Sequence, residues 1–222
     1  MQINWYNITC MNNYLQDIYS SHHSKNRPEN FSILEEERSF LLKEYIGKGK
    51  NVLDIGCRDG NLTKHFVSGN TVTGVDIDSN SLLKAKEKLN IETLIVDLNG
   101  EWEELKDKKF DVVVAGEILE HLYYPESVIK KVLNHLNDGG IFIGSIPNAF
   151  SLKHRMRYLF GTKKFTPLSD PTHINHFEYK EFKKLLYKYF NDVEIIGLGR
   201  YKLLSKIFTS FVSFDFFFVC KK

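Results

Sequence analysis

Apolar residues in this chain of 222 residues are arranged in two kinds of segment that alternate along most of its length. From about residue 51, short β-rich apolar runs alternate with segments in which apolar residues recur at helical spacing. Strands that are apolar on both faces are typical of a parallel sheet covered by helices on both sides. The pattern therefore predicts an α/β fold with a doubly wound, mostly parallel sheet.

Individual elements can be placed from the same pattern. Strands are expected at 51–56, 71–78, 93–98, 110–116, 141–146, 193–198 and 214–222, and helices at 32–46, 61–68, 79–89, 126–137 and 180–190. The last two strands follow one another closely and are expected to form an antiparallel hairpin at the sheet edge. We expect one domain over 1–222, with a helical cap at 1–31 and a lid-like insertion at 149–176.

Composition narrows the class of protein. The net charge is only +2, so the molecule as a whole is no polyanion binder, and nucleic acid is not the expected partner. Three scattered cysteines argue against a disulfide framework and against a zinc site. The N-terminus resembles no signal peptide, and the longest apolar stretch, from Ile207, is too short to span a membrane. A cytoplasmic protein without a membrane span is therefore expected, with its oligomeric state open.

The stretch "VLDIGCRDG" has the features of a ligand-binding turn between a strand and the next helix. Gly56 and Gly60 allow a ligand to approach the backbone closely, because no Cβ intervenes. Asp76 ends the second strand, at the distance at which dinucleotide-binding units place an acid on the ribose hydroxyls. Asp54 and Asp59 would repel a phosphate but suit a cation. The turn is therefore expected to hold a positively charged nucleoside.

Four motifs in order, "VLDIGCRDG", "GVDID", "LIVDL" and "FDVVVAGEILEHL", resemble those of class I S-adenosylmethionine-dependent methyltransferases. The resemblance implies a seven-stranded, Rossmann-like sheet with an antiparallel last strand and S-adenosylmethionine as cofactor. It also implies a role for each matching residue. Asp54 and Gly56 would face the amino acid part, Gly60 would support the turn, Asp76 would bind the ribose, and Ile77, Asp97 and Leu98 would contact the adenine. Arg58 stands where the family often has glycine.

"GEILEHL" places Glu117, Glu120 and His121 at helical spacing, so that a helix would bring them to one face. Oxygen and imidazole ligands suit Mg²⁺ or Mn²⁺. A second histidine group, His173 and His176, follows the fifth strand. Because loops after parallel strands gather at the carboxyl edge of the sheet, the two groups are expected to meet there.

Glu-x-x-Glu-His, Pro147-Asn148 and the later "HFEY" are together similar to small-RNA 3′-end 2′-O-methyltransferases, and ubiquinone-biosynthesis O-methyltransferases share Glu-x-x-Glu-His. The resemblance implies a divalent metal held by Glu117, Glu120, His121 and His176. We expect His173 to be a loop residue. Three interpretations of the cluster stay open: a metal site, a metal-free catalytic histidine and a structural role.

The insertion at 149–168 carries five Lys and Arg residues and no acid, which favours an anionic acceptor. We therefore expect an O-methyltransferase, with metal assistance as one version, that acts on a small phosphorylated or nucleotide-linked capsule or glycan precursor. The expected catalytic residues are His121, His176 and Glu117. Three alternatives remain: an RNA 3′-end 2′-O-methyltransferase, a cofactor-binding regulatory partner without catalysis, and a NAD-linked oxidoreductase, which the missing G-x-G-x-x-G spacing disfavours.

Overall fold

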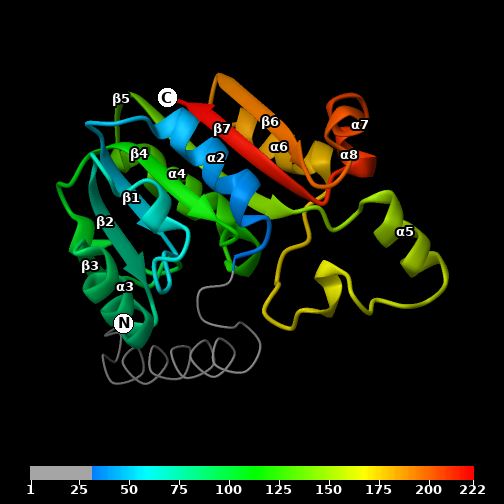
Figure 1. The fold of residues 1–222 in the computed structure, drawn as a ribbon, viewed down its shortest axis with the longest axis horizontal. Coiled ribbons are helices and arrows are strands. Elements are labelled where there is room, and N and C mark those ends of the chain that lie inside the picture. Colours follow the sequence, from blue (N-terminus) through cyan, green and yellow to red (C-terminus); the bar gives the residue numbers. More distant parts are fainter. Residues whose placement is uncertain (1–31) are drawn as a thin grey trace, which may run out of the picture.

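The computed structural model describes residues 32–222, which form one seven-stranded sheet in the order β3-β2-β1-β4-β5-β7-β6 (Figure 1). The strands are β1 (Asn51–Ile55), β2 (Thr71–Asp76), β3 (Glu92–Ile95), β4 (Phe110–Gly116), β5 (Leu136–Pro147), β6 (Asp192–Leu198) and β7 (Asp215–Lys221). Neighbouring strands among β1 to β5 pair in parallel, whereas β7 is antiparallel to both β5 and β6. The predicted doubly wound sheet and its antiparallel last strand are confirmed.

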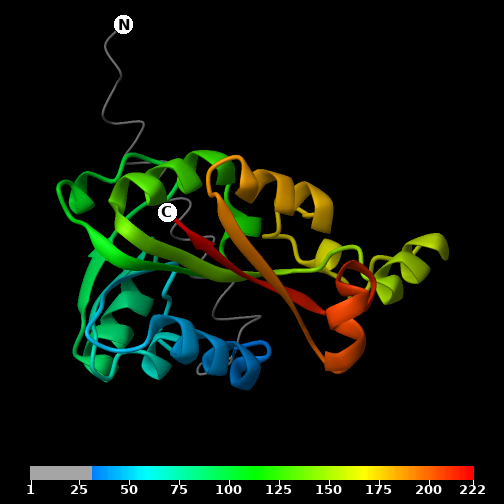
Figure 2. The same ribbon diagram turned by 90° about the horizontal axis from the view of Figure 1, so that it is seen from above.

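Helices cover both faces of this sheet, with α2 on one face and α4 and α6 on the other (Figure 2). The α-helices are α2 (Glu35–Ile46), α3 (Ser79–Leu89), α4 (Pro125–His135), α5 (Leu152–Leu159), α6 (Tyr179–Tyr187), α7 (Lys202–Ile207) and α8 (Thr209–Val212). Short 3-10 turns are η1 (Thr63–His65), η2 (Glu103–Leu105), η3 (Leu119–His121) and η4 (Pro167–Ser169). Within the described residues, no helix is both long and apolar enough to cross a bilayer.

The core is divided by the sheet into two apolar layers. Alternate residues of β1 point to opposite faces: Leu53 and Ile55 pack in the layer under α4 and α6, and Val52 packs in the layer under α2. Both layers are closed by fully buried side chains, such as Phe182 of α6 and Leu42 of α2. Burial on both faces explains why the strands are continuous apolar runs in the sequence.

Three local expectations were wrong. The helix expected at 61–68 is only the 3-10 turn η1, in which the Thr63 hydroxyl donates to the buried Asp54 carboxylate. The helix α4 ends at His135, because Leu136 already pairs with Phe110 as the first residue of β5. The "LEH" segment is the 3-10 turn η3 rather than part of a long helix. In each case tertiary contacts override local propensity.

The insertion at 149–176 has two unlike parts. Its first part contains α5, which projects from the end of the molecule beyond β5 (Figure 1). Its second part contains η4 and returns toward the sheet before α6. The expected cap at 1–31 lies outside the described residues.

Candidate functional site

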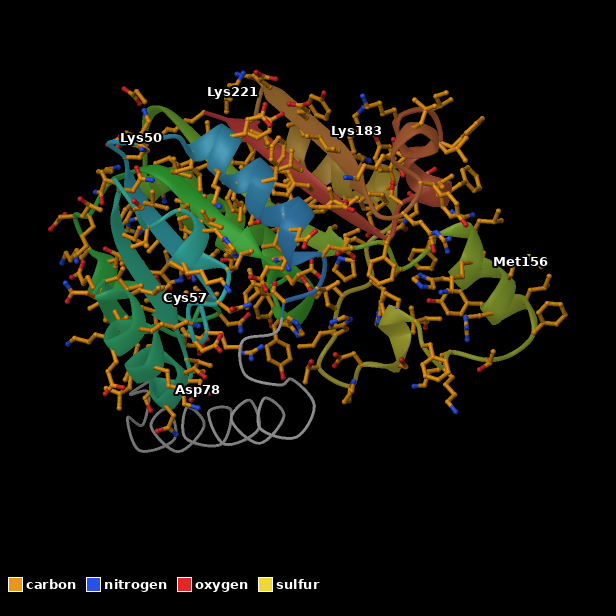
Figure 3. All side chains as sticks on the ribbon, viewed as in Figure 1. Lys50, Cys57, Asp78, Met156, Lys183 and Lys221 are labelled. Carbon is orange, nitrogen blue, oxygen red and sulfur yellow. The ribbon has the colours of Figure 1, made fainter. Side chains whose placement is uncertain are left out.

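A cavity of about 690 Å³ opens at the carboxyl edge of the sheet. Gly56, Asp76, Asp97 and Glu117 line it from the ends of β1 to β4, and residues 165–173 of the insertion close its other side. In Figure 3, Cys57 and Asp78 mark this edge, whereas Lys50 and Lys221 lie at the opposite edge. The cavity has the size of a site for a small molecule or cofactor.

The turn after β1 has a backbone shape that a ligand site requires. Gly56 has φ 73°, and a Cβ there would lie 2.7 Å from Cδ1 of Ile118, so a side chain would collide with the segment after β4. Gly60 has φ 73° as well, and its missing Cβ makes room for Leu89 of α3. Arg58 adopts φ 50°, which is the left-handed conformation that glycine favours. This conformation explains why glycine is often expected at this position of the turn.

Asp76 holds this turn in place while lining the cavity. Its Oδ2 accepts a hydrogen bond from the Arg58 N–H at 2.9 Å, and its Oδ1 accepts one from the Asp78 N–H at 2.9 Å. Burial raises the pKa of Asp76 to about 6, although these hydrogen bonds favour the charged form. The carboxylate is therefore ionised at neutral pH and able to accept hydrogen bonds from a ligand's hydroxyl groups.

The structure separates the seven residues predicted to form the cofactor site into two groups. Five of them line the cavity: Gly56, Asp76, Ile77, Asp97 and Leu98. Asp54 and Gly60 do not. Asp54 is buried, and its carboxylate accepts a 2.6 Å hydrogen bond from Thr63. Burial raises the pKa of Asp54 to about 7. In this structure Asp54 thus supports the turn.

A compact group of carboxylate and imidazole side chains includes two residues that line the cavity, His121 and His173, and one that does not, Glu120. One ligand atom each from Glu120, His121 and His173 lies within 4.8 Å of the others. Glu120 is fully buried, and its Oε1 is 3.8 Å from Nε2 of His121. A carboxylate and two imidazoles at this spacing fit a divalent cation.

Backbone carbonyls fix both imidazoles of this group. Nδ1 of His121 donates to the Thr172 carbonyl at 2.9 Å, and Nδ1 of His173 donates to the Pro167 carbonyl at 3.1 Å. In this tautomer each Nε2 carries a lone pair, which is the arrangement that metal-binding histidines show. The Glu120 carbonyl accepts hydrogen bonds from the N–H groups of Ile174 and Asn175, both at 2.9 Å, so the insertion is tied to η3.

Two of the four expected ligands are not part of this group. Glu117 has φ 58° and donates its N–H to the Ser145 carbonyl, so it lies between β4 and η3 and does not share a helical face with Glu120. It lines the cavity. The His176 ring is 6.4 Å from the His173 ring, and burial lowers the pKa of His176. The group thus contains His173, which was expected to be a loop residue, and does not contain His176.

Asp215, at the start of β7, is a cavity residue that sequence reasoning did not select. Its side chain is fully buried, and neither carboxylate oxygen has a hydrogen-bond partner among the described residues. Burial and the nearby Glu117 raise its pKa well above the ordinary range. The available signal was one acid inside the apolar run "FVSFDFFFV", because isolated buried carboxyl groups are costly and cluster at functional sites.

Comparison with models of known protein families identifies the family of this chain. The profile of the family described as "Methyltransferase domain" matches residues 25–191, which include the glycine turn, Asp76, η3 and the insertion. The chain belongs to this family. The class I S-adenosylmethionine-dependent methyltransferase domain expected from the four motifs is therefore confirmed.

The curated relatives share about a third of the aligned residues with this chain. The chain is 36% identical over 108 residues to the ubiquinone biosynthesis O-methyltransferase of Glaesserella parasuis, covering 44% of this chain and 46% of that protein. It is 32% identical over 116 residues to the ubiquinone biosynthesis O-methyltransferase of Coxiella burnetii, covering 50% of each. The chain spans about half the length of the curated relatives it matches.

Solved structures agree on the fold. A methyltransferase from Archaeoglobus fulgidus, described as SAM dependent, superposes with a TM-score of 0.64 at 21% identity, covering 92% of this chain and 99% of that one. The plantazolicin methyltransferase BpumL, solved in complex with a monoazolic desmethylPZN analog and SAH, superposes with a TM-score of 0.62 at 18% identity, covering 93% of this chain and 89% of that one. At these identities the likeness establishes the Rossmann-like fold.

Proposed function

We propose that this domain transfers the methyl group of S-adenosylmethionine to an oxygen of a small anionic acceptor, with a divalent cation at Glu120, His121 and His173. A phosphorylated or nucleotide-linked glycan precursor is the acceptor class we favour. One observation carries the proposal: a single cavity is lined both by the nucleoside-type residues Gly56 and Asp76 and by the histidines of the Glu120 group.

The cofactor side of the cavity suits a nucleoside. The ionised Asp76 accepts hydrogen bonds from ribose hydroxyls, and the apolar side chains of Ile77 and Leu98 flank a planar base. Gly56 lets the remaining part of the ligand approach the backbone beside Glu117. The bound cofactor supplies a methyl group on a positively charged sulfonium, so the protein mainly has to align it with the acceptor.

The acceptor side must orient a hydroxyl and remove its proton. In the displacement the bond between the methyl carbon and the acceptor oxygen forms as the carbon–sulfur bond breaks, and the hydroxyl proton passes to a base. Two cavity residues can accept it: His121 through Nε2, and Glu117 through its carboxylate. A divalent cation at Glu120, His121 and His173 would lower the pKa of the acceptor hydroxyl, which leaves Glu117 as the base.

Methyl transfer to a pool of sugar phosphates and nucleotide-linked sugars, followed with radiolabelled S-adenosylmethionine, tests this proposal. We expect transfer with Mg²⁺ or Mn²⁺ and its loss in excess EDTA. Glu120→Gln should lower turnover by about a hundredfold or more, because the buried carboxylate is lost from the cation site. The same variant should bind S-adenosylhomocysteine normally, because Glu120 does not line the cavity.

Glu103→Gln, an exposed acid on η2, is the matched control and should be fully active. Full turnover in excess EDTA, with no metal found by elemental analysis, would contradict the proposal that a divalent cation takes part. A histidine or Glu117 would then be the base without metal assistance. No heat of binding with S-adenosylhomocysteine, for correctly folded protein, would contradict the activity itself.

A further inference from the structure

One end of the molecule combines exposed apolar side chains with positive charge. We define the basic-apolar end as residues 150–165, which include α5, and residues 200–214, which include α7 and α8. Both ribbon views place these three helices at the same end (Figures 1 and 2). Two ring contacts join the two segments: the Arg155 guanidinium lies 5.1 Å from the Phe211 ring centre, and the His154 ring centre lies 6.4 Å from that of Phe214.

The apolar character of this end is unusually concentrated. Twelve of the twenty large apolar side chains that are exposed in the described part of the chain lie here. They are Leu152, Met156, Leu159, Phe160, Phe165, Tyr201, Leu203, Leu204, Ile207, Phe208, Phe211 and Phe214. Leu159 is 75% exposed and Phe160 is 78% exposed, and Figure 3 shows Met156 at the same projecting helix. Scattered exposed apolar residues are ordinary, whereas a contiguous group marks an interaction surface.

The charge of this end has a single sign. The two segments contain eight basic residues and no acid, although the whole chain has a net charge of only +2. The eight are Lys153, Arg155, Arg157, Lys163, Lys164, Arg200, Lys202 and Lys206. Several lie beside the apolar side chains, as Arg157 and Lys164 do beside the Phe165 ring. The partner must therefore offer negative charge and an apolar interior.

We propose that the basic-apolar end docks on the surface of an anionic lipid bilayer. A bilayer with acidic headgroups meets both requirements: Lys and Arg contact the headgroups while Leu, Ile and Phe enter the acyl boundary. The docking is peripheral and independent of which acceptor the domain methylates. Phe165 and Phe214 are exposed and also line the cavity, so a docked molecule would open its cavity beside the membrane surface.

Two other occupants fit these observations less well. A second copy that docked through the same end would bring eight positive charges against eight others, which is repulsive. Single-stranded nucleic acid would suit the basic and aromatic residues, because bases stack on aromatic rings. Nucleic acid would not account for the exposed aliphatic side chains of Leu159, Leu203 and Ile207, because bases do not stack on aliphatic groups.

Co-sedimentation with vesicles tests the proposal on the full chain. We expect binding to phosphatidylcholine vesicles that contain phosphatidylglycerol to exceed binding to pure phosphatidylcholine vesicles by about tenfold or more, and to weaken with salt. Lys163→Glu with Lys164→Glu should abolish the preference for the anionic vesicles. Leu159→Ser should weaken the binding that remains at high salt, because that part comes from apolar insertion.

Matched controls lie elsewhere on the surface. Lys86→Glu with Lys106→Glu makes the same change of charge, and Leu83→Ser on α3 removes an apolar side chain that is 56% exposed. These variants should bind vesicles as the parent protein does. Equal loss in the control and test variants, equal binding to both kinds of vesicle, or no binding to either would overturn the proposal. Binding of a single-stranded oligonucleotide without vesicle binding would replace the bilayer with nucleic acid.

Discussion

At the scale of single residues, the site and the turn beside it contain two carboxyl groups whose pKa values burial raises toward neutral pH. Asp76 and Asp54 have pKa values raised to about 6 and about 7, chiefly because burial disfavours the charged form. Both values lie above the 3.8 of an unperturbed aspartate, so the folded protein binds these protons more tightly than the unfolded chain. Their contribution to stability is present at low pH and is lost as pH rises toward 7.

The raised pKa of Asp76 predicts a pH dependence of cofactor binding. An ionised carboxylate accepts hydrogen bonds from ribose hydroxyls better than the protonated acid, so affinity for S-adenosylhomocysteine should fall as pH drops below about 6. The fall should approach tenfold per pH unit, since the protonated fraction grows at that rate. Calorimetric titrations across this range provide the measurement. Asp76→Asn should bind weakly with a flat profile, and a flat profile in the parent protein would contradict the assignment.

At the scale of elements, the site depends on how tightly β4 and β5 pair. A Cβ at Gly144 would lie 2.0 Å from the backbone oxygen of Ala115 on β4, which no side-chain movement can relieve. Because Glu117 and η3 follow directly from β4, any shift of this strand moves Glu117, which lines the cavity, and Glu120 of η3. The pairing of two central strands therefore fixes the positions of the residues that we propose to be catalytic.

Gly144→Ala should destabilise the protein by about 3 kcal/mol or more, because the clash is with backbone rather than with a mobile side chain. Thermal or urea unfolding followed by circular dichroism measures the loss. Gly100→Ala is the control, because its new Cβ would lie 3.4 Å from the nearest atom, and it should unfold almost as the parent does. Similar stability of the two variants would show that β4 and β5 are not packed as described.

At the scale of the whole molecule, the cavity is built from segments far apart in sequence. Gly56, Asp97, Glu117, Thr172 and Asp215 all line it, and each belongs to a different part of the chain. A ligand in this cavity would bind the folded protein and not the unfolded chain, because only folding brings these residues together. Binding must therefore raise the free energy of unfolding through mass action.

S-adenosylhomocysteine at a hundred times its dissociation constant should add about 2.7 kcal/mol of stability. For a domain of this size that corresponds to a rise in Tm of about 5–10 °C in a thermal shift assay. NAD is the comparison ligand and should produce no rise, since the turn lacks the dinucleotide spacing. A rise with NAD that matched the rise with S-adenosylhomocysteine would favour the oxidoreductase that we set aside.

The sequence by itself determined the sheet, the glycine turn and the acid that ends β2. These features rest on local rules: apolar runs mark buried strands, and a strand followed by a glycine turn and an acid at fixed distance places Gly56 and Asp76 together. The antiparallel pairing of β6 with β7 agrees with the hairpin expected from two late apolar runs, although residues 199–214 between them contain the helices α7 and α8, which the pattern did not predict. Such information is carried by neighbours in the chain.

Only the tertiary structure decided which acids and histidines meet. Glu117 follows β4 in a left-handed conformation, so the helical spacing of "GEILEHL" did not bring it to Glu120. His173 joined Glu120 and His121 because the insertion hydrogen-bonds to η3, and Asp215 reached the cavity because β7 pairs beside β5. Contacts of this kind depend on the packing of distant segments, and no periodicity within one segment can encode them.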